Sequence, residues 1–111
     1  MNQSNYVEAP EIDREKLISL LVDELPVLRA KIGLSQGELS DIIGVSRQTY
    51  SAIETRKRKM TWNTFLSIVL VFGYNEKTSD MLEGCGAFPK ELRDMLNTNN
   101  RKEGQNGTAD S

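Results

Sequence analysis

Two short segments with helix-start signals lie on either side of Gly44. Ser35 precedes the first segment and Glu38 follows three residues later, which is the spacing of a capping box. Ser46 precedes the second segment in the same N-cap position. We therefore expect short helices over about residues 36–43 and 47–55. Gly44 lies between them, where a sharp reversal of the chain favours a residue that adopts positive φ.

The apolar residues of this helix pair predict how the two helices pack. Leu39, with Ile42 or Ile43, faces inward from the first helix, and Tyr50 and Ile53 face inward from the second. Two short helices joined by a glycine-bearing turn have the pattern of a helix-turn-helix.

A longer apolar face precedes the pair. Five residues repeat at helical spacing over residues 11–32: Leu17, Leu21, Leu25, Leu28 and Ile32. Gly33 follows at the position where glycine ends helices. Pro26 lies inside this run, and because proline is best tolerated in a first turn, we expect a break near residues 23–26 and hence an extra N-terminal helix.

The second half of the chain also has helical periodicity. Thr61 caps a predicted helix that ends at Gly73, and its apolar residues are Trp62, Phe65, Ile68, Val69 and Phe72. A short turn near residues 79–83 and a C-terminal helix from Pro89 follow. No strand-like alternation occurs, so the fold class is all-α, a compact bundle of about five helices with the extra N-terminal helix and the C-terminal helix. The expected organisation is a flexible arm over 1–10, a helical domain over 11–97 with its core at 25–75 and the helix-turn-helix at 36–54, and a disordered tail over 98–111.

The composition excludes several classes of function. The 111 residues suit one small domain, and they include no histidine and a single cysteine, Cys85. No catalytic residue, metal ligand set or cofactor motif is therefore predicted, and we expect a protein that is not an enzyme. The longest apolar run, residues 68–72, is too short to cross a membrane, and the first residues lack the features of a signal peptide. A cytoplasmic location is expected.

Positive charge is concentrated beside the helix pair. The net charge of the chain is -2, but residues 47–59 contain five basic residues and only one acid, Glu54. Four of the bases are consecutive: Arg56, Lys57, Arg58 and Lys59. A local basic patch attracts an anionic partner even on an acidic molecule, so these four residues are candidate contacts to a phosphate backbone.

The outward face of the second helix of the pair carries polar residues with base-reading chemistry. Arg47 has the geometry to bond guanine, and Gln48 to bond adenine. Thr49 can form a hydrogen bond or contact a thymine methyl group. Ser51 and Ala52 complete this free face, and the N-terminus of the helix itself favours a phosphate.

These residues resemble a known family. The segment "LRAKIGLSQGELSDIIGVSRQTYSAIE" is similar to the helix-turn-helix domain of Cro/C1-type regulators, the XRE family, and the resemblance covers about residues 25–75. It implies a bundle of about five helices whose third helix reads DNA.

The resemblance also assigns roles to individual residues. Arg47, Gln48, Thr49 and Ala52 fall on base-reading positions, although Ala52 replaces a longer polar residue. Gln36 is expected to contact phosphate and to brace the recognition helix. The other expected contacts to the DNA backbone at the helix pair are Ser35, Ser46 and Ser51. Arg29 and Glu54 fall on positions of an ion pair between helices, and Gly44 has a structural role in the turn.

The sequence departs from the family pattern in two places, the turn after Glu54 and residue 50. Arg56 stands where glycine is usual, with Met60 where proline is common, so the turn after Glu54 is the least predictable part of the domain. Tyr50 is bulkier than the usual Ile or Val, and it fits only if the wedge between the helices has room or its hydroxyl reaches solvent.

The function expected from these observations is a sequence-specific regulator of transcription, a bacterial repressor that binds double-stranded DNA at a palindromic operator as a homodimer. Two alternatives stay open. One is an antitoxin or co-regulator that holds a protein partner through residues 11–24 or 76–97, which are also the candidate dimer surfaces. The other is an adaptor that has lost DNA binding.

Overall fold

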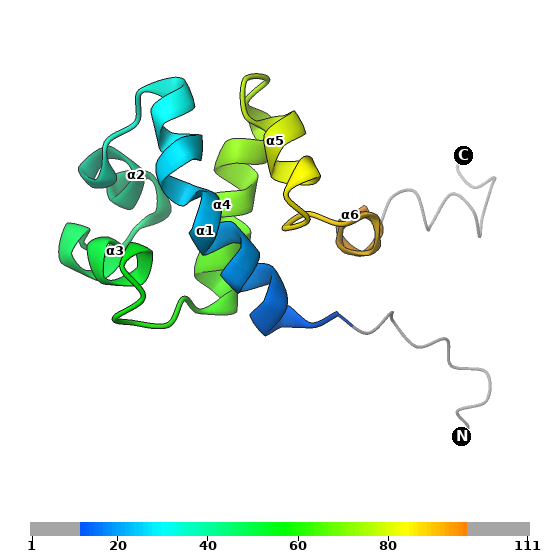
Figure 1. Cartoon of the computed structure of the whole chain (residues 1–111), viewed down its shortest axis with the longest axis horizontal. Helices are drawn as coiled ribbons and strands as arrows, with labels where there is room; N and C mark the ends of the chain where they lie inside the picture. Colours follow the sequence, from blue (N-terminus) through cyan, green and yellow to red (C-terminus); the bar gives the residue numbers. More distant parts are fainter. Residues whose placement is uncertain (1–11, 98–111) are drawn as a thin grey trace, which may run out of the picture. The chain divides into compact units, whose positions relative to one another are not determined.

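The computed structural model describes residues 12–97, and these residues are all-α. The elements are α1 (Arg14–Ile32), α2 (Gln36–Ile43), α3 (Arg47–Glu54), α4 (Trp62–Tyr74), α5 (Ser79–Gly84) and α6 (Lys90–Leu96) (Figure 1). The all-α prediction is confirmed. The predictions for residues 1–10 and 98–111 lie outside the described residues. None of the described helices has the length and apolar character needed to span a membrane.

The break predicted at Pro26 is wrong, because α1 is one continuous helix with Pro26 inside it. The predicted extra N-terminal helix is therefore the first half of α1. Leu17 and Leu21 before the proline, and Leu25 and Leu28 around it, are all buried on one face, while Pro26 is exposed. A proline inside a helix costs about 3 kcal/mol, but each fully buried leucine contributes about 1.5–3 kcal/mol. Burial on both sides of the proline outweighs the missing backbone hydrogen bond.

The helix pair forms as its caps predict. The backbone N–H of Glu38 donates to Ser35 Oγ at 3.0 Å, and the N–H of Ser35 donates to Glu38 Oε1 at 2.8 Å, which completes the capping box. Gly44 ends α2 with φ 83°. Leu39 is fully buried, as predicted, but Ile42 is 59% exposed, and Ile43 is only half-buried. The first helix of the pair therefore contributes mainly Leu39 to the core.

Helix α4 supplies a large share of the core. Phe65, Ile68, Val69 and Phe72 are buried, and α4 contacts α1, α2 and α5. The helix continues through Tyr74, past the end predicted at Gly73, and Thr61 caps it by accepting from the N–H of Thr64.

Thr78 connects α4 to the next helix. Its buried hydroxyl donates to the carbonyl of Phe72 at 2.7 Å. The segment predicted as a turn near residues 79–83 is the short helix α5, with Leu82 buried.

Arg14–Phe88 form one compact unit, which holds α1 to α5. Helix α6 belongs to a second unit and is described by itself. It begins after Pro89, as predicted, and Lys90 pairs with Asp94 one turn later at 2.9 Å.

Candidate nucleic-acid interface

Helix α3 has one face in the core and one face in solvent. Tyr50 and Ile53 are buried, whereas Arg47 and Gln48 are exposed in the first turn. The remaining predicted interface residues of α3, which are Thr49, Ser51 and Ala52, are half-buried. Helices α2 and α3 lie side by side at one end of their unit (Figure 1), and α3 also contacts α1. The sequence-predicted base-reading residues therefore share one accessible face.

The N-termini of α2 and α3 are close to each other. A Cβ placed on Gly37, in the first turn of α2, would lie 3.8 Å from Cδ of Arg47 in the first turn of α3. Ser35 and Gln36, at the start of α2, therefore lie on the same side as the predicted recognition residues. Two helix N-termini with unpaired N–H groups form a surface that favours phosphate.

Ser46 organises the first turn of α3. Its Oγ accepts from the N–H of Thr49 at 3.0 Å and donates to Thr49 Oγ1 at 3.0 Å. The hydroxyl hydrogen of Thr49 can still be donated outward, because Oγ1 uses a lone pair in that contact. Arg47 and Gln48 make no side-chain hydrogen bond or ion pair within the described residues, so both are available to a ligand.

The C-terminal end of α3 is held by Glu54, whose carboxylate receives four hydrogen bonds. Arg29 donates twice, from Nε to Oε2 at 3.0 Å and from Nη2 to Oε1 at 2.9 Å. Gln36 Nε2 donates to Oε1 at 2.8 Å, and Tyr50 Oη donates to Oε2 at 2.6 Å. We call these four residues the Glu54 hub. The hub ties α3 to α1 through Arg29 and to α2 through Gln36.

The electrostatics of the Glu54 hub maintain its charge state. Burial alone would raise the pKa of Glu54, but the hydrogen bonds from Arg29, Tyr50 and Gln36 outweigh it and hold that pKa below its ordinary value. Burial, and then the neighbouring carboxylate, raise the pKa of Tyr50 well above its ordinary value. The hydrogen bond to Glu54 raises the pKa of Arg29. Glu54 is therefore ionised and Tyr50 is a neutral donor at neutral pH.

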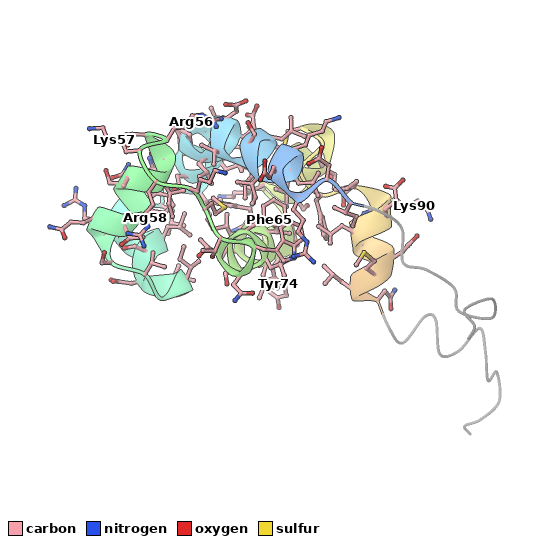
Figure 2. The ribbon with its side chains drawn as sticks, turned by 90° about the horizontal axis from the view of Figure 1, so that it is seen from below. Arg56, Lys57, Arg58, Phe65, Tyr74 and Lys90 are labelled. Atoms are coloured by element: carbon pink, nitrogen blue, oxygen red, sulfur yellow. The ribbon has the colours of Figure 1, made fainter. Side chains whose placement is uncertain are left out.

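The turn after α3 is built on Arg56 in the left-handed conformation, with φ 66°. This residue stands where the family pattern has glycine, and it keeps the glycine-like backbone. Its side chain is turned back to α1: Nη2 donates to the carbonyl of Ser19 at 3.2 Å and pairs with Asp23. Figure 2 shows Arg56 beside the ribbon of α1. Arg56 is thus engaged within the protein.

The other three basic residues of the connector between α3 and α4 (residues 55–61) differ in whether they form ion pairs. Lys59 lies 3.9 Å from Glu15, and both side chains are highly exposed, so this pair is loose. Lys57 and Arg58 have no ion pair within residues 12–97, and Lys57 points away from the ribbon (Figure 2). Of the four candidate backbone contacts, Lys57 and Arg58 are the two most available to DNA.

The structure also identifies residues that the sequence analysis missed. The hydroxyl of Tyr50 reaches neither solvent nor an empty space, but Glu54. The spacing of four residues between Tyr50 and Glu54 places them on one helix face and could have predicted this bond. Ser19 and Asp23, the partners of Arg56, carried no such signal because they lie more than thirty residues away in the chain.

Trp62 and Cys85 belong to the protein body. Trp62 stacks on Phe65 with ring centroids 4.5 Å apart, and the guanidinium of Arg14 lies 4.9 Å from its ring. Burial raises the pKa of the Cys85 thiol, which lowers its reactivity. Among residues 12–97, no cluster of three or more His, Cys, Asp or Glu side chains has the arrangement of a metal site.

Comparison with known families agrees with this geometry. Residues 28–76 match the family model HTH_3, described as "Helix-turn-helix". Searches of curated proteins and of solved structures found no match. The matched residues include α2, α3, α4 and the connector, which is the region that carries the exposed face of α3 and the whole Glu54 hub. Residues 28–76 therefore form a helix-turn-helix domain of the Cro/C1 type, the XRE family, which is a DNA-binding kind of domain found in regulators.

Proposed function

We propose that this protein is a sequence-specific repressor of transcription that binds a palindromic operator as a homodimer, with α3 in the major groove. The observation that carries the proposal is the pairing of two features in α3. Its first turn presents Arg47 and Gln48, whose side chains have no hydrogen bond or ion pair among residues 12–97, while its last residue is fixed by the Glu54 hub. A recognition helix must both reach the bases and hold a defined angle, and residues at its N-terminal end contact base edges first.

The roles of the recognition residues follow from their chemistry. Arg47 would pair with guanine and Gln48 with adenine, and each good bidentate pair contributes about 1–3 kcal/mol of discrimination. Thr49 would accept or donate one hydrogen bond, or contact a thymine methyl group. Ala52, one turn later, offers only apolar contact.

Contacts to the phosphate backbone would surround this base-reading surface. Ser35, Gln36 and Ser46 lie at the two helix N-termini, and Ser51 lies on the free face of α3. Lys57 and Arg58 would add charge-assisted contacts from the connector, and Lys59 could join them because its pair with Glu15 is loose. Arg56 contributes less because α1 already engages it.

A homodimer is proposed because a single module buries too little surface. One such domain buries roughly 600–1,000 Å² on DNA, and a second half-site one helical turn away doubles the contacts. Residues 11–24 or 76–97 would supply the dimer surface. Selection of bound sequences from random DNA tests this point, because a dimer enriches palindromic sites, and enrichment of a single half-site would contradict it.

Replacement of Gln48 with alanine tests base reading. We expect Gln48→Ala to weaken binding to the selected operator by roughly 1–3 kcal/mol and to leave binding to random DNA nearly unchanged. Asn63→Ala, an exposed change on α4, is the control and should alter neither. Equal losses of Gln48→Ala on both DNAs would remove Gln48 from the base-reading set.

Neutralisation of the two free connector bases tests backbone binding. The double variant Lys57→Gln, Arg58→Gln should lower the slope of log affinity against log salt by about one unit for each phosphate that the protein no longer neutralises. A single variant with the same charge change, Lys31→Glu, lies outside the proposed interface and both candidate dimer surfaces, and it controls for net charge. Equal slopes for the double variant and this control would exclude Lys57 and Arg58 from the interface.

One observation favours a second candidate, a co-regulator that also holds a protein partner. Leu70 and Tyr74 lie one turn apart on α4 and are 69% and 89% exposed (Figure 2 shows Tyr74). Exposed apolar side chains at one turn's spacing are suited to contact another protein. Failure of random-DNA selection to enrich any sequence would favour this candidate, or an adaptor without DNA binding, over the repressor.

A further inference from the structure

A cavity of about 410 Å³ lies between the first half of α1 and the connector that follows α3. Its floor is formed by four apolar side chains: Ile18 and Val22 from α1, Ile53 from α3, and Met60 at the end of the connector. Three of these are nearly buried, with 3% of Ile53, 5% of Met60 and 6% of Val22 exposed. The cavity is therefore a hollow over the core and not a gap between surface chains.

The size and lining of this cavity are those of a small-molecule site. Binding sites for small ligands have volumes of about 300–1,000 Å³, and they combine mainly apolar walls with a few polar groups that fix orientation. Here the polar groups stand at the rim, on the connector and at the start of α1.

The rim carries an excess of positive charge. Arg56, Arg58 and Lys59 line the cavity, and Glu15 is the acid among its lining residues. Glu15 holds Lys59 only loosely, at 3.9 Å between two exposed groups, and Arg58 has no ion pair among the described residues. An anionic group entering here would meet Arg58 and Lys59 without first displacing a short ion pair.

We propose that this cavity binds a small amphipathic carboxylate, with its apolar body against Ile18, Val22, Ile53 and Met60 and its carboxylate beside Arg58 and Lys59. The positive charge of the rim favours the carboxylate group of the ligand, and the apolar floor favours its hydrocarbon part. Neither feature lies on the base-reading face of α3, so the site is separate from the DNA-reading residues.

Occupation of the site would oppose DNA binding, a consequence that rests on the proposed function. A carboxylate that engages Arg58 removes that residue from phosphate, and the connector is the wall shared by the cavity and the proposed backbone contact. Coupling of this kind is reciprocal, so DNA would weaken binding of the carboxylate by the same factor.

The binding site is tested without DNA. We would titrate the isotope-labelled full chain with decanoate and follow the backbone amide signals by NMR. Saturable shifts are expected at residues 15–22 and 53–60, and decanol and decylammonium should bind about two- to fivefold more weakly because they lack the pairing charge. Absence of saturation, shifts centred on Leu70 and Tyr74, or equal binding of the three probes would overturn the proposal.

Matched variants locate the site further. Arg58→Gln should weaken decanoate binding, while Lys57→Gln, the same charge change on the adjacent residue that does not line the cavity, should leave it unchanged. Ile18→Trp places a larger side chain in the cavity and should abolish binding, whereas Val27→Trp, at an exposed position of α1 outside the cavity, should not. Equal effects within either pair would contradict the assignment.

The regulatory consequence has its own measurement. With the selected operator, saturating decanoate should lower DNA affinity several-fold for the wild-type chain and leave Arg58→Gln unaffected. Decanoate binding without any change in DNA affinity would refute the coupling and leave the site intact. A chain that binds no DNA would refute the proposed function, and the NMR titration would still decide the site.

Discussion

The hydroxyl of Tyr50 is the part of the Glu54 hub that can be removed with the smallest structural change. Tyr50→Phe deletes one oxygen and keeps the ring, which is fully buried against the core. The deleted group donates a 2.6 Å hydrogen bond to a carboxylate that is 8% exposed. Phenylalanine leaves no donor in its place, so Glu54 Oε2 keeps only its bond from Arg29.

The expected loss of stability depends on how many hydrogen bonds Glu54 keeps in the variant. A hydrogen bond to a charged group contributes about 1.5–3 kcal/mol, but Glu54 retains three of its four donors. We therefore expect a value near or just below the lower end of that range, a decrease of about 1–2 kcal/mol in the free energy of unfolding at pH 7. For a domain of this size the decrease corresponds to a fall in Tm of roughly 5–15 °C.

The effect should depend on pH with a defined sign. The hub holds the pKa of Glu54 below its ordinary value of about 4.3, so its stabilisation is complete above that value and disappears as the pH falls through the lowered folded pKa. A protonated carboxyl accepts a weaker, neutral hydrogen bond. The difference in unfolding free energy between wild type and Tyr50→Phe should therefore shrink as the pH falls from 7 through that lowered folded pKa.

Urea denaturation of both proteins across this pH range measures the effect. Tyr74→Phe is the matched control, since Tyr74 is 89% exposed and removal of its hydroxyl should change stability by less than about 0.5 kcal/mol. A Tyr50→Phe variant as stable as wild type at pH 7, or one whose deficit grows as the pH falls, would refute the assignment of this bond to an ionised Glu54.

Substitutions at three positions test the backbone conformation. Gly44→Ala should cost about 1–2 kcal/mol in thermal denaturation, because φ is 83° and no atom lies near the added Cβ, so the cost is conformational strain alone. Gly37→Ala, in the first turn of α2, meets only ordinary contacts at 3.8 Å and should instead stabilise by up to about 1 kcal/mol; destabilisation would show that Arg47 cannot accommodate the Cβ. Arg56→Gly removes both the left-handed strain and the exposed ion pair to Asp23, so its stability should be close to that of wild type. Arg56→Ala keeps the strain and should be about 1 kcal/mol less stable than Arg56→Gly. Equal stabilities of the two variants would exclude strain at this position.

The helix boundaries around the recognition helix could be predicted because their causes are local. Ser35 with Glu38, Ser46 and Thr61 each satisfy backbone N–H groups within three residues, so the signal lies within one short stretch of sequence. The positive φ of Gly44 follows from the same local chemistry. These signals place the exposed face of α3, and with it Arg47 and Gln48.

The continuity of α1 and the turn at Arg56 could not be predicted in the same way. Pro26 is a local signal to stop, and burial of leucines on both sides overrides it through contacts with other helices. Arg56 is a poor residue for a left-handed turn, and its partners Ser19 and Asp23 lie in α1. For the continuous α1 and for the left-handed turn at Arg56, the stabilisation comes from tertiary contacts, which a local sequence pattern does not contain.

Besides Gln36 of α2, two anchors of the C-terminal end of α3 come from one helix, α1. Arg29 holds Glu54, the last residue of α3, and Ser19 and Asp23 hold Arg56, two residues beyond. The N-terminal end of α3 is organised by Ser46 from within its own turn. The N-terminal end of α3 is thus free to meet a ligand, and under the proposed function α1 helps to set the angle at which it meets DNA. Substitutions in α1 that touch no DNA should therefore change operator affinity, and a ligand between α1 and the connector would act on the same junction.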